Sequence, residues 1–181
     1  MRDIKGYNTF SKIQQINKGM SSDKKYYIET AGGQRLLLRI ADISEYERKK
    51  AEFDIMKKAV MLGISMPQPI DFGICDSGKS VYTLLTWIDG KEVETVLPTL
   101  TESEQYTLGA KSGEILHKIH TIPAPENADD WSARYFSVID ERLAAFRSEG
   151  FPFDGDATIL DFIESNRCLL KNRPQCRHHG D

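Results

Sequence analysis

The chain has 181 residues, of which 40% are hydrophobic, so it is long enough to bury a sizeable core in one domain or two closely joined lobes. Its net charge is −3, with Lys and Arg scattered among Asp and Glu, and this balance gives no electrostatic reason to expect a nucleic-acid or membrane partner. No apolar run approaches the roughly 18 residues of a membrane span, and residues 1–6 lack the apolar core of a signal peptide, so we expect a cytoplasmic protein.

The first third of the chain has the pattern of short strands. Residues 10–16 and 24–30 are each rich in strand-forming side chains and are predicted to form a hairpin. After a glycine-containing turn, residues 35–40 form a third predicted strand. Arg39 interrupts the apolar run of that strand, and an exposed edge arginine is its simplest interpretation until a partner is found.

The hairpin tip, residues 17–23, is polar. It contains Gly19 and the hydroxyl groups of Ser21 and Ser22, together with backbone N–H groups that no strand uses. Such a tip could wrap a phosphate group, although most tips of this kind are simply solvated loops.

A helix is predicted from Ser44 to about Leu62. Ser44 and Glu47 have the spacing of a capping box, and the glycine after Leu62 is a typical stop signal. At roughly 100° per residue, Glu52 falls in the middle of the apolar arc of this helix, whereas Glu47 projects to the polar side.

A carboxylate that faces a core is costly unless it is paired, so Glu52 requires a cation. Arg39 on the third strand is the nearest candidate in the predicted topology. A bidentate pair between Glu52 and Arg39 would fix the guanidinium so that its remaining N–H groups could hold phosphate oxygens. A purely structural ion pair is the alternative.

Residues 80–90 divide the chain into a strand-rich half and a helix-rich half. Within this stretch, residues 81–88 are rich in β-branched and aromatic residues, as a buried strand should be, and Asp89 and Gly90 supply the turn that ends the strand. Two halves joined by one strand make a cleft, where unpaired backbone groups could hold a nucleotide base. An ordinary core strand that ends in a turn is an equally good interpretation of this stretch alone.

The second half reads as helices. Thr101 and Glu104 form another capping box, which opens a helix to about His120, and further helices are predicted over 132–148 and 157–170. The first of these helices carries an apolar stripe that we expect to be buried, formed by Leu108, Ile115, Leu116 and Ile119.

The sequence ends in His179, Gly180 and Asp181. An aspartate at the edge of a cleft can orient a hydroxyl group and accept its proton during attack on a γ-phosphate, with His179 packed beneath the loop. A tripeptide alone does not decide between this interpretation and an ordinary turn.

The order of these parts resembles the aminoglycoside phosphotransferase family, small-molecule kinases with a protein-kinase-like fold. The resemblance covers nearly the whole chain and is carried by residues 36–40, Glu52, and residues 62–69, 84–90, 113–120 and 179–181. It implies an α+β, two-lobed fold, with an antiparallel sheet plus one helix in an N-terminal lobe (residues 1–85), a hinge (86–90) and a mainly helical, truncated C-terminal lobe (91–181).

The resemblance also implies a nucleotide, ATP or GTP, and a small-molecule acceptor, which could be an antibiotic, an amino alcohol or a sugar. Thr86 and Ile88 would contact the base through their backbone. Arg39 would hold phosphates where many relatives carry lysine, with Glu52 orienting it, and Asp181 would be the catalytic aspartate.

The metal-binding residues of this family follow the catalytic aspartate, so the ligands of Mg²⁺ are expected beyond Asp181 and none within this chain. We therefore predict a fragment of a kinase that binds nucleotide weakly and does not turn over by itself. Two alternatives stay open: a non-catalytic nucleotide-binding or regulatory module, and a structural α+β domain in which Arg39 and Glu52 merely pair.

Overall fold

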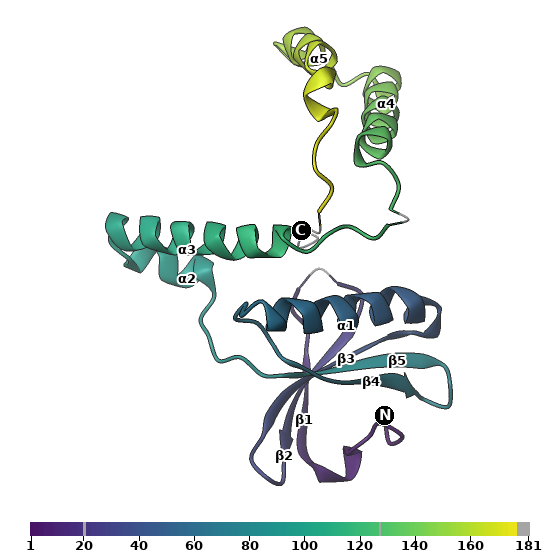
Figure 1. The fold of residues 1–181 in the computed structure, drawn as a ribbon, viewed down its shortest axis with the longest axis vertical. Helices are drawn as coiled ribbons and strands as arrows, with labels where there is room; N and C mark the ends of the chain where they lie inside the picture. The colour runs from purple at the N-terminus through teal and green to yellow at the C-terminus, as the bar shows by residue number, and fades with distance from the viewer. Residues whose placement is uncertain (20, 127, 177–181) are drawn as a thin grey trace. The chain divides into compact units, whose positions relative to one another are not determined.

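A computed structural model describes residues 1–19, 21–126 and 128–176 of the chain (Figure 1). The chain forms two compact units, Met1–Lys118 and Ile119–Asp181. The described part of the first unit contains an antiparallel five-stranded sheet together with α-helices and short 3-10 helices, and the described part of the second is helical. This architecture confirms the predicted α+β class with a sheet in the N-terminal part.

The sheet has the strand order β1-β2-β3-β5-β4, and every neighbouring pair is antiparallel. Its strands are β1 (Phe10–Ile16), β2 (Lys24–Thr30), β3 (Arg35–Asp42), β4 (Pro69–Cys75) and β5 (Ser80–Thr86). The bounds of β1 and β2 are those predicted, because each strand ends at a polar turn. β5 stops at Thr86, so Ile88 lies outside the strand that was predicted to include it.

Helices connect and follow the strands. In the first unit these are the short 3-10 helices η1 (Tyr7–Thr9), η2 (Ile43–Glu45) and η3 (Leu97–Thr99), with α1 (Tyr46–Met61) and α2 (Val93–Val96). Helix α3 (Glu102–His120) also belongs to the first unit except for its last two residues. The second unit contains α4 (Trp131–Glu149), α5 (Asp156–Ser165) and the 3-10 helix η4 (Arg167–Leu170). None of the helices in the described ranges is long and apolar enough to cross a lipid bilayer.

The two faces of the sheet are covered differently. Because side chains alternate along a strand, Leu38 and Leu84 point to one face, where the N-terminal segment packs Ile4 against them. Helix α1 packs against β4 and β5 on the other face (Figure 1), with the Phe53 and Phe72 rings 5.5 Å apart. Arg39 is one position from Leu38 and therefore lies on the α1 face.

The capping box at Thr101 is confirmed. The Thr101 N–H donates to Glu104 Oε2 at 2.8 Å, and the Glu104 N–H donates to Thr101 Oγ1 at 3.3 Å. The box expected at Ser44 is wrong, since Asp42 Oδ1 accepts from the Ser44 N–H at 2.9 Å and from its hydroxyl at 2.7 Å. Asp42 is therefore the N-cap residue of the 3-10 helix η2, and α1 begins after it, at Tyr46.

The apolar stripe expected on α3 is not buried. None of the helix residues that the structure describes falls in the buried class, and Leu108 and Ile115 are each 38% exposed. The prediction was wrong because periodicity shows which side of a helix is apolar, not whether another segment of the described chain covers it.

Candidate functional site

The guanidinium of Arg39 is held on the α1 face of the sheet by Asp23. Asp23 is the last residue of the β1–β2 loop, and its Oδ2 atom accepts from Arg39 Nε at 2.9 Å and lies 2.6 Å from Nη2. Ser21 of the same loop lies next to this pair, with its Oγ 3.4 Å from Arg39 Nη2. The structure therefore brings together two residues that were expected at a phosphate site, Arg39 and Ser21.

A second cation shares the same carboxylate oxygen. Lys49 of α1 donates from Nζ to Asp23 Oδ2 at 2.7 Å, and its side chain is only 6% exposed. The side chain of Asp23 is 2% exposed. Arg39, Asp23 and Lys49 thus form one cluster that joins β3, the β1–β2 loop and α1.

The expected pair between Arg39 and Glu52 is wrong. In the described part of the chain, Glu52 contacts Arg48 at 2.5 Å and Lys49 at 3.5 Å, and its side chain is 42% exposed. Arg48 and Lys49 lie four and three residues before Glu52 on the same helix, where side chains meet without any long-range folding cost. Asp23, which reaches the sheet face from the loop, takes the place beside Arg39 that was assigned to Glu52.

The pKa of Asp23 shows which influence dominates in this cluster. Burial raises the pKa of the carboxyl group, but hydrogen bonds and charges from Lys49 and Arg39 outweigh burial and hold the pKa below its ordinary value. Asp23 is therefore ionised at neutral pH. Two cations share this one buried carboxylate, so the cluster itself carries one excess positive charge.

The β1–β2 loop is folded back by contacts of its own. Lys25 Nζ donates to the Lys18 carbonyl at 2.7 Å, and the Asp23 N–H donates to Ser21 Oγ at 3.1 Å. Gly19 has φ of 90°, a conformation that favours glycine, so this position does require its residue type.

Ser22 does not join Arg39. It lines a separate polar cavity of about 350 Å³ together with Lys24, Tyr26, Asp42 and Asp76. Lys24 and Tyr26 are two residues apart on β2, so their side chains point to the same face of the sheet, away from that of Arg39. Of the two loop hydroxyls expected at a phosphate site, only that of Ser21 lies beside the guanidinium.

The segment after β5 makes defined backbone contacts. The Thr86 N–H donates to the Gln68 carbonyl at 3.0 Å, while the Gln68 N–H donates to the Thr86 hydroxyl at 2.8 Å. The Trp87 N–H donates to the Arg35 carbonyl at 3.0 Å. The Thr86 N–H is therefore already used, and Thr86 could contact a base only through its carbonyl oxygen. Ile88 is the next residue along the chain whose backbone groups are not engaged in the strand pairing between β3 and β5.

The same segment is clasped to the sheet through its side chains. Arg35 Nη1 and Nη2 donate to the two carboxylate oxygens of Asp89 at 2.7 and 2.5 Å, a bidentate ion pair. The rings of Tyr27 and Trp87 lie edge to face with their centroids 4.8 Å apart. These contacts fix the course of residues 86–90 relative to β2 and β3.

Two predicted residues, His179 and Asp181, lie outside the residues that the structure describes. Within residues 1–19, 21–126 and 128–176, no group of three or more His, Cys, Asp or Glu side chains lies together in a way that could hold a metal ion by itself.

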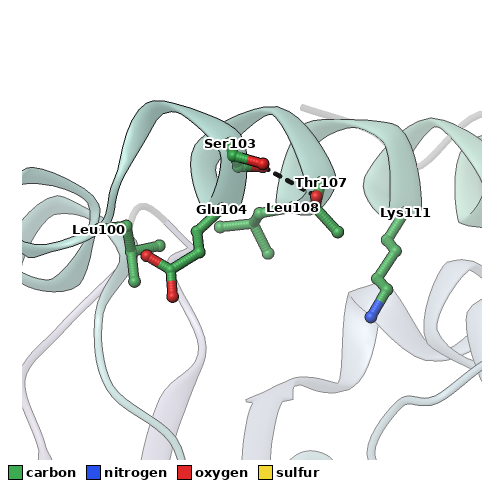
Figure 2. A pocket seen from close by; sticks show the side chains of 6 residues that line it. All are labelled: Leu100, Ser103, Glu104, Thr107, Leu108 and Lys111. Carbon is green, nitrogen blue, oxygen red and sulfur yellow. Dashed lines mark hydrogen bonds between the residues drawn. The ribbon is translucent and has the colours of Figure 1, made fainter.

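An open hollow of about 300 Å³ lies along α3 (Figure 2). Leu100 and Leu108 supply its apolar lining, and Glu104 and Lys111 its charged groups. The Oε2 atom of the Glu104 carboxylate accepts from the Thr101 N–H and hydroxyl in the capping box. The hollow is a surface feature of α3, separate from the Arg39 cluster.

Comparison with known proteins identifies the family and the fold of the chain. The family model described as phosphotransferase enzyme family matches residues 12–181. A search of curated protein sequences gave no match. Among solved structures, a fructosamine-3-kinase homologue from Haemophilus somnus 129PT is similar with a TM-score of 0.55 and 16% identity, covering 92% of this chain and 57% of that one.

A mutant of an aminoglycoside 2'-phosphotransferase IIIa in complex with GDP matches with a TM-score of 0.53 and 14% identity, over 96% of this chain and 56% of that one. A GDP and kanamycin complex of another aminoglycoside phosphotransferase gives a TM-score of 0.52 and 12% identity, over 88% and 53%. The chain thus spans little more than half the length of these structures, and it shares their kinase-like fold. With a family model that matches nearly its whole length, the chain belongs to the phosphotransferase enzyme family.

Proposed function

We propose that this chain is the nucleotide-binding part, with a portion of the acceptor-binding part, of a small-molecule kinase that transfers the γ-phosphate of ATP or GTP to a hydroxyl group. Residues 1–85 would bind the nucleotide, 86–90 would act as the hinge, and 91–181 would begin the helical lobe. The observation that supports this proposal is the guanidinium of Arg39, fixed beside the Ser21 hydroxyl at the end of the β1–β2 loop.

A purine nucleotide is supported by two sets of observations. Two structural neighbours are GDP complexes of aminoglycoside phosphotransferases. In this chain, the clasped segment after β5 offers the Thr86 carbonyl and the Ile88 N–H, an acceptor and a donor of the kind that a purine edge requires. ATP and GTP present different donors and acceptors on that edge, so a titration with both nucleotides identifies the preferred one.

The chemistry would be a single displacement. Asp181 would accept the proton of the acceptor hydroxyl, whose oxygen forms a bond to the γ-phosphorus as the bond to the β-phosphate oxygen breaks. His179 would support the loop that carries Asp181. Arg39 would neutralise phosphate charge in the ground state and in the transition state, and Mg²⁺, with ligands expected beyond Asp181, would supply additional charge when bound.

Nucleotide binding is tested by titrating the 181-residue chain with ATP and with adenosine by calorimetry. We expect ATP to bind more tightly than adenosine, and Arg39→Ala to reduce ATP affinity about tenfold while adenosine affinity stays the same. Lys12→Ala is the matched control, because Lys12 is a half-exposed cation of β1 paired with Glu29, and its loss changes the net charge equally. Equal ATP affinity in the Arg39 and Lys12 variants would contradict the proposal.

Phosphotransfer is tested with the 181-residue chain and with a longer chain that extends past Asp181. We expect turnover of ATP with hydroxyl acceptors such as kanamycin or a fructosamine in the longer chain alone, and Asp181→Asn to abolish it. Equal turnover by both chains would contradict the fragment hypothesis. ATP binding without turnover in either chain would favour a non-catalytic nucleotide-binding module instead.

A further inference from the structure

We propose that Asp23 and Lys49 are positioning residues for the nucleotide phosphates: Lys49 fixes Asp23, and Asp23 orients Arg39. This inference rests on the proposed function, since it names the groups that prepare the same site for its ligand. A loop carboxylate, Asp23, and a helix cation, Lys49, thus take the role that the sequence predicted for Glu52.

Asp23 binds one edge of the Arg39 guanidinium and so fixes its direction. Asp23 engages the Nε and Nη2 atoms of Arg39, which together form one edge of the planar group. The Nη1 atom takes part in no hydrogen bond or ion pair within the described residues, and the Arg39 side chain is 31% exposed. The carboxylate therefore leaves Nη1, on the other edge of the guanidinium, available to bind a phosphate oxygen beside the Ser21 hydroxyl.

Lys49 is buried beside Asp23. Its side chain is 6% exposed, so its ammonium group cannot contact a ligand in solution without a rearrangement of α1. A buried cation must be compensated, and Asp23 at 2.7 Å is the nearer of its two carboxylates, with Glu52 at 3.5 Å. Lys49 therefore acts on the site through Asp23, as a positioning residue.

Two residues of the β1–β2 loop, Ser21 and Asp23, contact each other as well as Arg39. Ser21 Oγ accepts from the Asp23 N–H and also lies 3.4 Å from Arg39 Nη2. The conformation of residues 21–23 and the direction of the guanidinium are thus set by the same contacts. An ordered guanidinium binds an anion with less loss of side-chain entropy than a free one, which is the advantage of preorganisation.

An opposite effect of Asp23 is also physically reasonable and defines the test. If the carboxylate only neutralised Arg39, its removal would leave more positive charge and strengthen ATP binding. If it orients Arg39, its removal weakens ATP binding despite the gain in positive charge. The sign of the change in ATP affinity therefore separates the two roles.

The experiment measures dissociation constants of ATP and adenosine for the 181-residue chain and its variants, well below their melting temperatures. The ratio of the two constants isolates the contribution of the phosphates, which a merely structural loss would not change. We expect Asp23→Asn to reduce ATP affinity about tenfold with adenosine affinity unchanged, and Lys49→Met to act in the same direction. Lys49→Arg should retain most of the ATP affinity that Lys49→Met loses, because it keeps a positive charge beside Asp23.

Two control variants match these substitutions on α1. Asp54→Asn removes a half-exposed carboxylate that pairs with Lys50 and Lys57, and Lys50→Met removes its exposed partner. Both should leave the ratio unchanged. The double variant with Asp23→Asn and Lys49→Met removes both nearly buried charges and leaves only the part-exposed Arg39 without a carboxylate, so it keeps the test open if a single variant fails to fold. Its ratio should equal that of Asp23→Asn, since Lys49 acts through Asp23.

The outcomes are distinct. An unchanged or larger phosphate contribution in Asp23→Asn and in the double variant, with ATP still bound by the unmodified chain, would overturn this inference and leave the proposed function standing. Failure of the unmodified chain to prefer ATP over adenosine would overturn the proposed function and, with it, the inference.

Discussion

The phenol of Tyr82 donates a hydrogen bond to Asp71 Oδ2 at 2.7 Å, and this bond joins β5 to the edge strand β4. Tyr82 is buried in the core on the face covered by the N-terminal segment. Burial, with the hydrogen bond to Asp71, raises the pKa of Tyr82 to about 12. Burial likewise raises the pKa of the Cys75 thiol to about 11. The core of the sheet therefore contains two groups that must stay neutral.

We expect the protein to lose stability in alkaline solution. Because the folded state holds the pKa of Tyr82 above its unfolded value of about 10, its contribution is complete below about pH 10 and is lost as the pH rises towards 12. Tyr82→Phe should be less stable at pH 7 but should flatten the fall in the free energy of unfolding above pH 10. Tyr106→Phe, at a largely exposed position on α3, is the control. An equally steep fall in Tyr82→Phe and the unmodified protein would contradict this prediction.

A second prediction concerns Gly73, which faces Tyr82 across β4 and β5. A Cβ atom at position 73 would lie 3.0 Å from Cε1 and 3.1 Å from the hydroxyl oxygen of Tyr82, closer than ordinary packing allows. Gly73→Ala should reduce the free energy of unfolding by about 1–3 kcal/mol, although alanine is otherwise preferred over glycine in a strand.

Chemical denaturation followed by the fluorescence of Trp87 tests this prediction in a Trp131→Phe background, where Trp87 reports on the sheet. Gly90→Ala is the control, because nothing lies within 4 Å of a Cβ atom placed there. In a Tyr82→Leu background the cost of Gly73→Ala should shrink. A cost that does not depend on the residue at position 82 would show that the ring is not its cause.

Much of the fold could be predicted from sequence because its signals are local. β1 and β2 end at polar turns, and the Thr101 capping box needs only two side chains three residues apart. The cluster around Arg39 could not be predicted in the same way, because Asp23 reaches it from the end of a loop that resembles any other polar turn. The burial of a loop residue depends on tertiary packing, which no local pattern records.

The burial of Lys49, unlike that of Asp23, is predictable from the sequence. Lys49 stands between Arg48 and Lys50, in a run that is typical of a solvated helix surface. However, Lys49 is four residues before Phe53, and residues with this spacing share one face of a helix. Since Phe53 packs against Phe72 of the sheet, Lys49 is carried to the buried side with it. The pattern could predict this burial but not the carboxylate that compensates it.

The pKa of Asp23 leads to a third prediction, at acidic pH. Lys49 and Arg39 hold the pKa of this carboxyl group below its ordinary value, so its contribution is present above the unfolded pKa of about 4 and is lost as the pH falls through the lower folded value. Asp23→Asn should be less stable at pH 7 and should show a shallower loss of stability below pH 4. Asp54→Asn should follow the unmodified protein closely, because its half-exposed ion pairs are screened by solvent. The free energy of unfolding measured from pH 2 to pH 7 tests both expectations, and a parallel acid limb in Asp23→Asn would contradict them.

The fourth prediction concerns helix caps. Thr101→Ala removes the acceptor for the Glu104 N–H and should cost about 1 kcal/mol of stability. Asp42→Ala should cost a similar amount, because this carboxylate accepts from the backbone and the side chain of Ser44. Ser44→Ala should cost clearly less, since the bond from its backbone N–H to Asp42 survives the substitution. A Ser44→Ala cost as large as that of Asp42→Ala, measured by urea denaturation of both variants, would show that the hydroxyl and not the carboxylate holds the start of η2.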